Sequence, residues 1–184
     1  MNIYDFDGTL RKGDSSAGFY LFCLSRRPYL ILLLPLQGIA ALLYAVKLIS
    51  ITAFKQFFYS YFRFINTVKL VPKYWDRDRE KIYSWYSEYR TENDVVVSAS
   101  PEFLLDPICR ELGIRKLIAS NVDPKTGRYT GKNCSGEEKR VRFLLEFPDH
   151  KVLNSYYDRD SDLPVSRLAE HGYRIVDGIP KQEF

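Results

Sequence analysis

Two aspartates near the start of the chain, Asp5 and Asp7, follow a short apolar segment and precede Gly8. Residues two apart in a strand point to the same side, and Gly8 permits the chain to turn where the strand ends. Both carboxylates are therefore expected together at the carboxyl edge of a sheet, where open α/β sheets bind their ligands. A solvated Asp-Gly turn after a buried strand is the alternative interpretation.

A second polar position is Ser98, which directly follows the apolar segment 95–97. Ser100 can cap a helix that begins at Pro101, and the free N–H groups of a helix start attract an anion. Ser98 is then expected where it can donate a hydrogen bond to a phosphoryl oxygen. A plain strand-to-helix connection would have the same sequence.

A lysine in an unfavourable place is the third signal. Ser135 and Glu138 fit a capping box, which puts Lys139 in the first turn of a helix. A cation there works against the helix dipole, so the placement suggests a purpose such as neutralising a phosphate. A solvated surface lysine remains the ordinary alternative.

The fourth signal is a cluster of acids after an apolar segment, formed by Asp158, Asp160 and Asp162. Clustered carboxylates at a sheet edge repel one another unless a cation lies among them. Hard oxygen ligands of this kind suit Mg²⁺. An exposed acidic loop is the alternative.

The elements that would position these residues alternate between short apolar runs and helical stretches, which predicts a parallel sheet with crossover helices. Strands are expected at residues 2–6, 94–98, 116–120, 152–156 and 173–176. Helices are expected at residues 101–112, 137–146 and 164–171, with a small hairpin at 123–131. Residues 15–90 are helical in pattern.

The segment from Ser15 to Trp75 differs from the rest of the chain in charge. It contains no Asp or Glu and holds half of the aromatic residues, whereas the whole chain has a net charge of +4. Its basic residues are Arg26, Arg27, Lys47, Lys55, Arg63, Lys69 and Lys73. The absence of acids favours an anionic surface or an anionic substrate.

Residues 29–46 carry no charge and approach the length of a bilayer span. A single span would separate the first strand from the others, and a return span would have to bury Lys55, Arg63 and Lys69. A full span is therefore rejected. Two alternatives remain: the helices are buried inside a cap, or the cap docks on a membrane surface. A second insert helix carries one apolar stripe, formed by Phe54, Phe57, Phe58, Tyr61, Phe62 and Ile65.

Taken in order, the four motifs resemble those of the haloacid dehalogenase superfamily of phosphatases. The insert after the first motif resembles subfamily IB, which includes phosphoserine phosphatase, and the strings KGDSS, SASPEFLL and DRDSDLP resemble most its phosphatidylglycerophosphatase C branch. The resemblance implies an α/β fold with a Rossmann-like, three-layer core built from a parallel sheet. Residues 1–14 and 91–184 would form this core, and residues 15–90 a helical cap inserted after the first strand.

The resemblance also implies roles for individual residues. Asp5 would be the nucleophile and Asp7 the general acid/base of a two-step reaction through an aspartyl-phosphate. The expected phosphate-binding residues are Ser98, Ala99 and Lys139, and the expected Mg²⁺ site comprises Asp5, Asp7, Asp158 and Asp162.

Three positions depart from the family pattern. Arg159 stands where a small residue is frequent, and its role stays open. Gly8 replaces a serine usual in phosphoserine phosphatases, and Asp14 lies near a position where those enzymes carry a longer glutamate.

Composition excludes several classes of protein. With 46% hydrophobic and 27% charged residues the chain is globular, its three cysteines form no CxxC motif, and two histidines exclude a His-rich metal site. No signal peptide precedes the first strand, so a cytoplasmic location is expected. A peripheral position on the inner face of the membrane is the alternative. No nucleic-acid partner is expected.

Three functions remain open. The first is a Mg²⁺-dependent phosphatase of an amphiphilic or lipid-linked phosphomonoester at the membrane surface. The second is a soluble phosphatase of a small, phosphoserine-like metabolite. The third is an inactive, membrane-associated binding protein, against which the intact acids speak.

Overall fold

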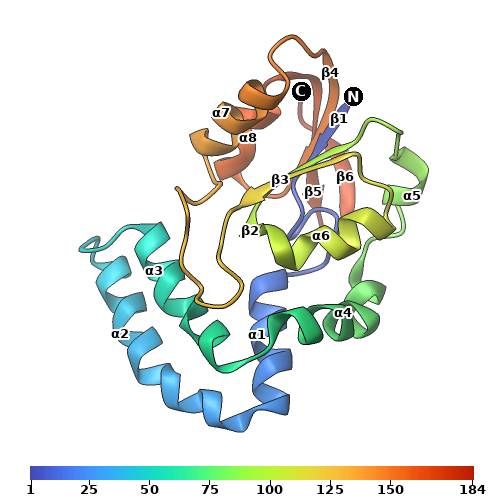
Figure 1. Ribbon diagram of the computed structural model, residues 1–184. Coiled ribbons are helices and arrows are strands. Elements are labelled where there is room, and N and C mark those ends of the chain that lie inside the picture. Colours follow the sequence, from blue (N-terminus) through green and yellow to red (C-terminus); the bar gives the residue numbers. More distant parts are fainter.

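A six-stranded sheet forms the centre of the computed structural model, which describes residues 1–184 (Figure 1). Its strand order is β3-β2-β1-β4-β5-β6, and every neighbouring pair is parallel except β5 and β6. The strands are β1 (Asn2–Tyr4), β2 (Val95–Pro101), β3 (Lys116–Ser120), β4 (Val152–Tyr157), β5 (Ala169–Val176) and β6 (Ile179–Gln182). Because β1 lies between β2 and β4, the residues that follow it are enclosed on both sides.

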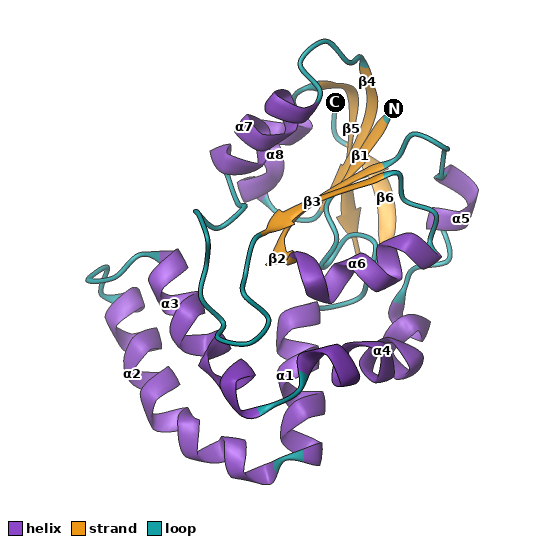
Figure 2. Ribbon diagram, in the orientation of Figure 1, coloured by secondary structure: helices purple, strands orange, loops and turns teal.

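Helices cover both faces of the sheet, as the secondary-structure colouring shows (Figure 2). Val95 and Val97 of β2 pack toward α7 (Glu137–Glu146) and α8 (Leu163–Ser166), whereas Val96 faces the cluster that contains α6 (Glu102–Glu111) and α5 (Tyr86–Tyr89). This alternation is the two-residue period of a strand buried on both faces. The predicted α/β, three-layer architecture is confirmed.

A group of helices lies between β1 and β2 in the chain and forms the lower half of the molecule in Figure 1. Asp14, Ser50 and Asn66 cap three of these helices, each accepting a hydrogen bond from a backbone N–H of the first turn. The helices are α1 (Ser15–Arg26), η1 (Pro28–Leu33), α2 (Leu34–Ala45), α3 (Ile51–Phe58), η2 (Tyr59–Phe64), α4 (Thr67–Asp78) and η3 (Arg79–Lys81).

One hydrophobic core runs from the sheet into this inserted helical part. Its 25 buried residues include Tyr4 and Val96 of the sheet, Phe19 of α1 and Trp75 of α4. The indole N–H of Trp75 donates a 2.6 Å hydrogen bond to the carbonyl of Leu104 in α6. Most of the aromatic residues counted in the insert are therefore structural.

A buried ion pair fastens the base of the insert to the turn after β1. Arg11 and Asp78 are both nearly inaccessible, and Arg11 Nε donates to Asp78 Oδ2 at 2.8 Å. Lys81 Nζ binds the other Asp78 oxygen at 2.6 Å, and Arg11 also donates to the hydroxyl of Tyr74 at 3.0 Å.

The C-terminal part of the sheet differs from the sequence prediction. The helix expected at 164–171 ends at Ser166, and β5 begins already at Ala169. The strand β6 was not predicted, although Asp177-Gly178 is a typical hairpin turn and both residues have the positive φ that such a turn needs. The first strand also ends earlier than expected, at Tyr4 instead of residue 6.

The inserted helices differ as well. The expected stripe helix is divided, because α3 ends at Phe58 and the 3₁₀ segment η2 follows. The segment Pro28–Ala45 is long and apolar enough to cross a membrane, and only 17% of it is buried. Strands before and after this segment share one sheet, so its two ends lie on the same side of any bilayer. This topology supports the rejection of a single span. The low burial of the segment contradicts the alternative in which the apolar run is packed inside a cap.

Candidate active site

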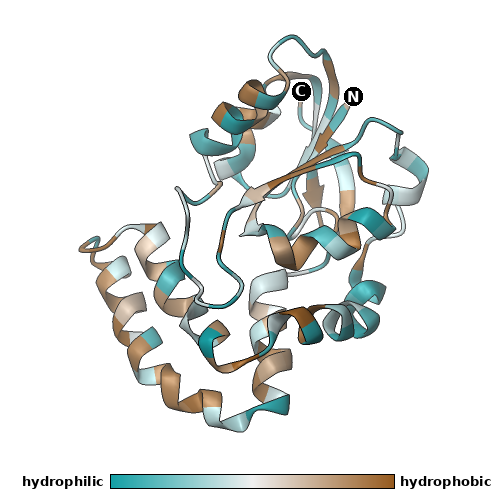
Figure 3. Cartoon of the chain, in the orientation of Figure 1, coloured by the Kyte–Doolittle hydropathy of each residue, from teal (hydrophilic) through white to brown (hydrophobic).

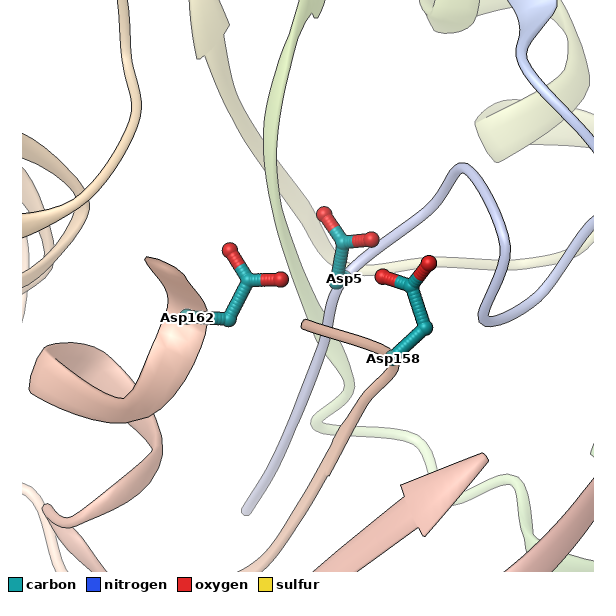
Figure 4. Close-up of side chains that lie close together, drawn as sticks. All are labelled: Asp5, Asp158 and Asp162. Atoms are coloured by element: carbon teal, nitrogen blue, oxygen red, sulfur yellow. The ribbon is translucent and has the colours of Figure 1, made fainter. Parts of the chain in front are cut away.

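Three carboxylates meet at the carboxyl edge of the sheet (Figure 4). Asp5 follows β1, Asp158 follows β4, and Asp162 lies at the start of α8. One oxygen from each of the three lies within 4.8 Å of the others. The parallel pairing of β1 with β4 brings the first two together, as the motif spacing predicts.

Lys139 lies against two of these acids. Its Nζ is 2.5 Å from Asp5 Oδ1 and 2.7 Å from Asp162 Oδ1, and the side chain is 2% exposed. Burial alone lowers the pKa of Lys139, but the carboxylates of Asp5 and Asp162 raise it above its ordinary value. The lysine therefore stays charged.

The first turn of α7 holds Lys139 as predicted, but the capping box is wrong. Gly136 occupies the N-cap with a positive φ of 60° and no side-chain cap, and Glu138 instead binds Arg142 at 2.8 Å.

The donor set fits a hard divalent cation. Asp158 Oδ1 is buried without a hydrogen-bond partner, which is costly unless something positive binds it. Burial and the charge of Asp5 raise the pKa of Asp158, and the same two causes raise the pKa of Asp162 to about 6. Such mutual repulsion among oxygen ligands is relieved by Mg²⁺. These three residues would hold the ion.

Asp7 lies in a different environment from this acidic cluster. Its Oδ1 accepts from the backbone N–H of Ser15 at 2.6 Å, and its Oδ2 accepts from the hydroxyls of Ser15 at 2.9 Å and Ser100 at 2.5 Å. The structure does not bring the Asp7 carboxylate into the acidic cluster named for the metal. Burial, followed by the charge of Asp14, raises the pKa of Asp7 to about 7.

The role expected of Ser100 is therefore corrected. Pro101 is the N-cap of α6, and the hydroxyl of Ser100 donates its hydrogen bond to Asp7 and does not cap the helix. Neither Ser15 nor Ser100 was identified as a partner of Asp7. The pairing depends on the start of α1 lying against the end of β2, which no local pattern reveals.

Gly8 keeps the turn between the two aspartates close to the acidic cluster. Its φ is +84°, and a Cβ at this position would lie 2.1 Å from Asp158 Oδ2. A serine there would meet the same carboxylate.

The predicted phosphate-binding segment lies beside these acids. Ser98 is buried, and its hydroxyl accepts from the N–H of Ser100 at 3.2 Å. The carbonyl of the neighbouring Ala99 accepts from Ser120 and from Lys55, each at 3.0 Å. Lys55 comes from α3 and thus links the inserted helices to the site.

An open cavity of about 310 Å³ is lined by the four aspartates, by the segment 98–100 and by Lys139, and the inserted helices form part of its wall. Tyr44, Ile51 and Lys55 form its wall on that side, while Arg159 lines the opposite wall. Lys55 was not predicted as a site residue. It contacts Asn133 Oδ1 at 3.1 Å, and burial lowers its pKa although Asp14 and Asp7 counteract the shift.

A smaller cavity of about 190 Å³ adjoins the first between α1 and α3. Asp14 and Lys55 line both cavities. The other lining residues are mostly apolar: Ser16, Ala17, Phe54, Phe58 and Tyr59. A polar cavity at the sheet edge is thus adjoined by a more apolar one between the inserted helices.

The arrangement combines an acid paired with a buried lysine, a separate acid whose pKa is raised to about 7, and a carboxylate cluster suited to Mg²⁺. A model of haloacid dehalogenase-like hydrolases matches residues 3–167, which includes every motif described above. The chain belongs to this family of hydrolases.

Two curated proteins are similar to part of the chain. The chain is 36% identical over 93 residues to Protein CicA of Caulobacter vibrioides, a match that covers 47% of this chain and 42% of that protein. It is 36% identical over 84 residues to a probable phosphatase of Mycobacterium tuberculosis, which covers 42% of this chain and 29% of that one. The matches thus span less than half of either relative.

The fold has a close counterpart among solved structures. A Bordetella pertussis protein of unknown function superposes with a TM-score of 0.73, at 19% identity, over 95% of this chain and 88% of that one. This likeness extends to the inserted helices, because it covers nearly the whole chain.

Proposed function

We propose that this hydrolase is a Mg²⁺-dependent phosphatase of phosphomonoesters that works through an aspartyl-phosphate on Asp5. The observation that carries the proposal is that Asp5 and Asp7, only two residues apart in the chain, have different contacts. Asp5 is paired with Lys139 beside the acidic cluster, whereas Asp7 is held by two serines and has a raised pKa.

In the first step, a carboxylate oxygen of Asp5 attacks phosphorus, and the bond from phosphorus to the leaving oxygen breaks. Asp7 donates its proton to that oxygen, so an alcohol leaves. In the second step, water attacks the aspartyl-phosphate and gives a proton to Asp7. The acyl phosphate bond breaks, which releases inorganic phosphate and regenerates the Asp5 carboxylate.

The surrounding residues stabilise charge on the phosphoryl group. Lys139 supplies a fixed positive charge, and Ser98 supplies a hydroxyl at the adjacent strand end. Bound at Asp5, Asp158 and Asp162, Mg²⁺ would supply further positive charge to the phosphoryl oxygens.

The substrate we propose is amphiphilic or lipid-linked, and the site of action is the membrane surface facing the cytoplasm. The apolar cavity between α1 and α3 supports this choice, because it offers Phe54 and Phe58 to a leaving group whose phosphate lies at Asp5. A small polar metabolite would leave this apolar surface unused.

The test is hydrolysis of p-nitrophenyl phosphate with Mg²⁺, followed by a panel of lipid phosphates and soluble phosphomonoesters. Asp5→Asn should abolish turnover while the protein stays folded, since an amide is a poor nucleophile. Asp160→Asn, in the same loop as the acidic cluster but outside it, is the control and should stay active.

Chelation with EDTA should silence the wild type, and Asp158→Ala should raise its Mg²⁺ requirement sharply. Turnover by Asp5→Asn, or full activity after exhaustive chelation, would refute the mechanism. Preference for a soluble phosphomonoester would replace the proposed substrate class and leave the chemistry standing.

A further inference from the structure

The outermost helix of the insert presents an apolar face that nothing in the fold covers. Figure 3 shows hydrophobic colouring along η1 and α2, the part of the chain farthest from the sheet. Leu32 is 78% exposed and Leu42 is 64% exposed. We define the docking face as six exposed residues, namely Leu32, Leu36, Ile39, Leu42, Val46 and Leu48.

These residues form a continuous strip. Leu36, Ile39 and Leu42 of α2 and its C-cap residue Val46 follow one another at intervals of three or four, which places them on one side of the helix. Only Gln37 and Ala40 of α2 are buried, and neither belongs to the strip. The Gln37 side chain accepts a hydrogen bond from the hydroxyl of Tyr20 and donates one to the carbonyl of Phe58. The orientation of α2 is therefore fixed with its apolar strip outward.

Positive charge stands at both ends of the docking face. Arg26 and Arg27 end α1 just before Pro28, and Lys47 lies between Val46 and Leu48; all three are exposed. No acid occurs between Ser15 and Trp75, so no carboxylate on these helices opposes an anionic partner. An apolar strip flanked by cations complements a bilayer that contains anionic lipid.

Charge also argues against a second copy of this chain as the occupant. In a two-fold symmetric contact the same face meets itself, so the three cations of one copy would approach those of the other with no acid between them. A transmembrane position is incompatible with the sheet, since β1 pairs directly with β2 and β4.

We propose that the docking face binds peripherally to an anionic bilayer, with α2 lying in the plane of the interface. The bilayer would be the partner of the proposed phosphatase of lipid-linked substrates. The biological purpose of docking rests on that proposed function, but vesicle binding itself does not depend on it. The same helices line the catalytic cavity through Tyr44 of α2 and Lys55 of α3. Docking would therefore hold the insert's wall of the cavity at the lipid surface.

Co-sedimentation of the full chain with vesicles tests the proposal without turnover. We expect binding to vesicles in which a third of the lipid is phosphatidylglycerol, weaker binding to pure phosphatidylcholine, and release as salt rises. Leu32→Gln with Leu42→Gln should weaken binding at least about tenfold, because each leucine loses its transfer from water. Leu145→Gln is the control: Leu145 is equally exposed but lies on α7, outside the inserted helices, so this variant should leave vesicle binding unchanged.

The charged residues have their own pair of variants. Arg26→Gln with Arg27→Gln should remove the preference for anionic vesicles, whereas Arg110→Gln on α6 should not. If the two control variants, Leu145→Gln and Arg110→Gln, lost as much vesicle binding as the variants in the inserted helices, the assignment of the docking face would be overturned.

The remaining outcomes separate docking from catalysis. Turnover of p-nitrophenyl phosphate without vesicle binding would refute docking and leave the phosphatase proposal intact. Vesicle binding without turnover would refute the phosphatase proposal and leave docking intact. A dimer in light scattering that Leu42→Gln dissociates, with no vesicle binding, would reassign the face to self-association. Resistance to alkaline extraction from membranes would refute peripheral attachment.

Discussion

At the scale of single residues, the site depends on giving two neighbouring aspartates different surroundings. Asp5 is paired with Lys139 and belongs to the acidic cluster with Asp158 and Asp162. Asp7 has serine donors but no cation in hydrogen-bond contact, and burial raises its pKa to about 7. Two carboxylates whose environments differ in this way suit two roles in one reaction.

Replacing Asp7 by asparagine tests its role in the second step. With p-nitrophenyl phosphate the leaving group needs little protonation, so Asp7→Asn should release one burst of nitrophenolate per enzyme. Steady turnover should then fall by about 10²–10⁴-fold, because no base activates the water. Rapid-mixing absorbance measures both phases. Undiminished steady turnover would remove Asp7 from the mechanism.

Gly8 offers a test of the close approach between the first turn and Asp158. Gly8→Ala adds a Cβ against Asp158 Oδ2, and at φ +84° it also strains the backbone by about 1–2 kcal/mol. We expect lower stability and a raised Mg²⁺ requirement. Gly113→Ala is the matched control, since Gly113 has φ +73° but open space around it.

Denaturant titration and Mg²⁺-dependent turnover distinguish the two effects. Both glycine variants should lose stability through the strained backbone, Gly8→Ala more than Gly113→Ala because its Cβ also meets Asp158. Gly8→Ala alone should lose metal affinity. Equal Mg²⁺ dependence in the two variants would show that the Asp158 carboxylate is not constrained by the turn.

At the scale of elements, the sequence predicted those parts whose causes are local. The strand 116–120 and the helix 137–146 were found at their true bounds, because apolar runs and flanking polar residues define them. β5 was missed at its start because Ala169, Glu170 and His171 do not read as a buried strand. These residues are held in the strand by their backbone pairing with β4 and not by strand-forming side chains.

The candidate site was predictable to a similar extent. The residues that follow strand ends were identified, since parallel topology brings strand ends together. Lys55, Ser15 and Ser100 were not assigned their contacts, because these depend on how the inserted helices sit on the sheet.

The buried Arg11–Asp78 pair is the clearest element-scale contact that sequence did not reveal. Asp78→Ala would leave the Arg11 charge buried without its partner, so it should destabilise the fold by about 3–5 kcal/mol. Asp76→Ala removes an exposed pair with Arg79 and should cost about 0–1 kcal/mol. Urea unfolding of both variants measures the difference. Equal losses would mean that the buried pair is not what fastens the insert.

The same aspartate predicts a pH dependence. Burial raises the pKa of Asp78, but Lys81 and Arg11 outweigh it and leave the pKa lower than in the unfolded chain. A lowered folded pKa means that the stabilisation is complete above the unfolded value of about 3.9 and is lost as pH falls through the folded value. The stability gap between wild type and Asp78→Asn should therefore narrow at acid pH. A constant gap from neutral pH to pH about 3 would contradict this assignment.

At the scale of the whole molecule, charge and hydrophobicity are distributed unevenly. The segment from Ser15 to Trp75 has basic residues but no acid and carries the exposed apolar strip, whereas the sheet edge carries the acidic cluster. The catalytic cavity lies where the two parts meet. Despite this division, the buried core is continuous across the boundary, since one cluster contains residues of both parts.

Because the core is continuous, we expect the insert and the sheet to unfold together. Trp75 of α4 is 2% exposed, donates to the carbonyl of Leu104 in α6, and packs edge-on against Phe6 with ring centroids 5.9 Å apart. Trp75→Ala should cost about 3–5 kcal/mol, and calorimetry should still show one transition. Native-state hydrogen exchange should show equal losses of protection in α1 and α6, because both rest on the same buried cluster. Exchange in α1 that accelerates while α6 stays protected would mean that the inserted helices unfold as a separate unit.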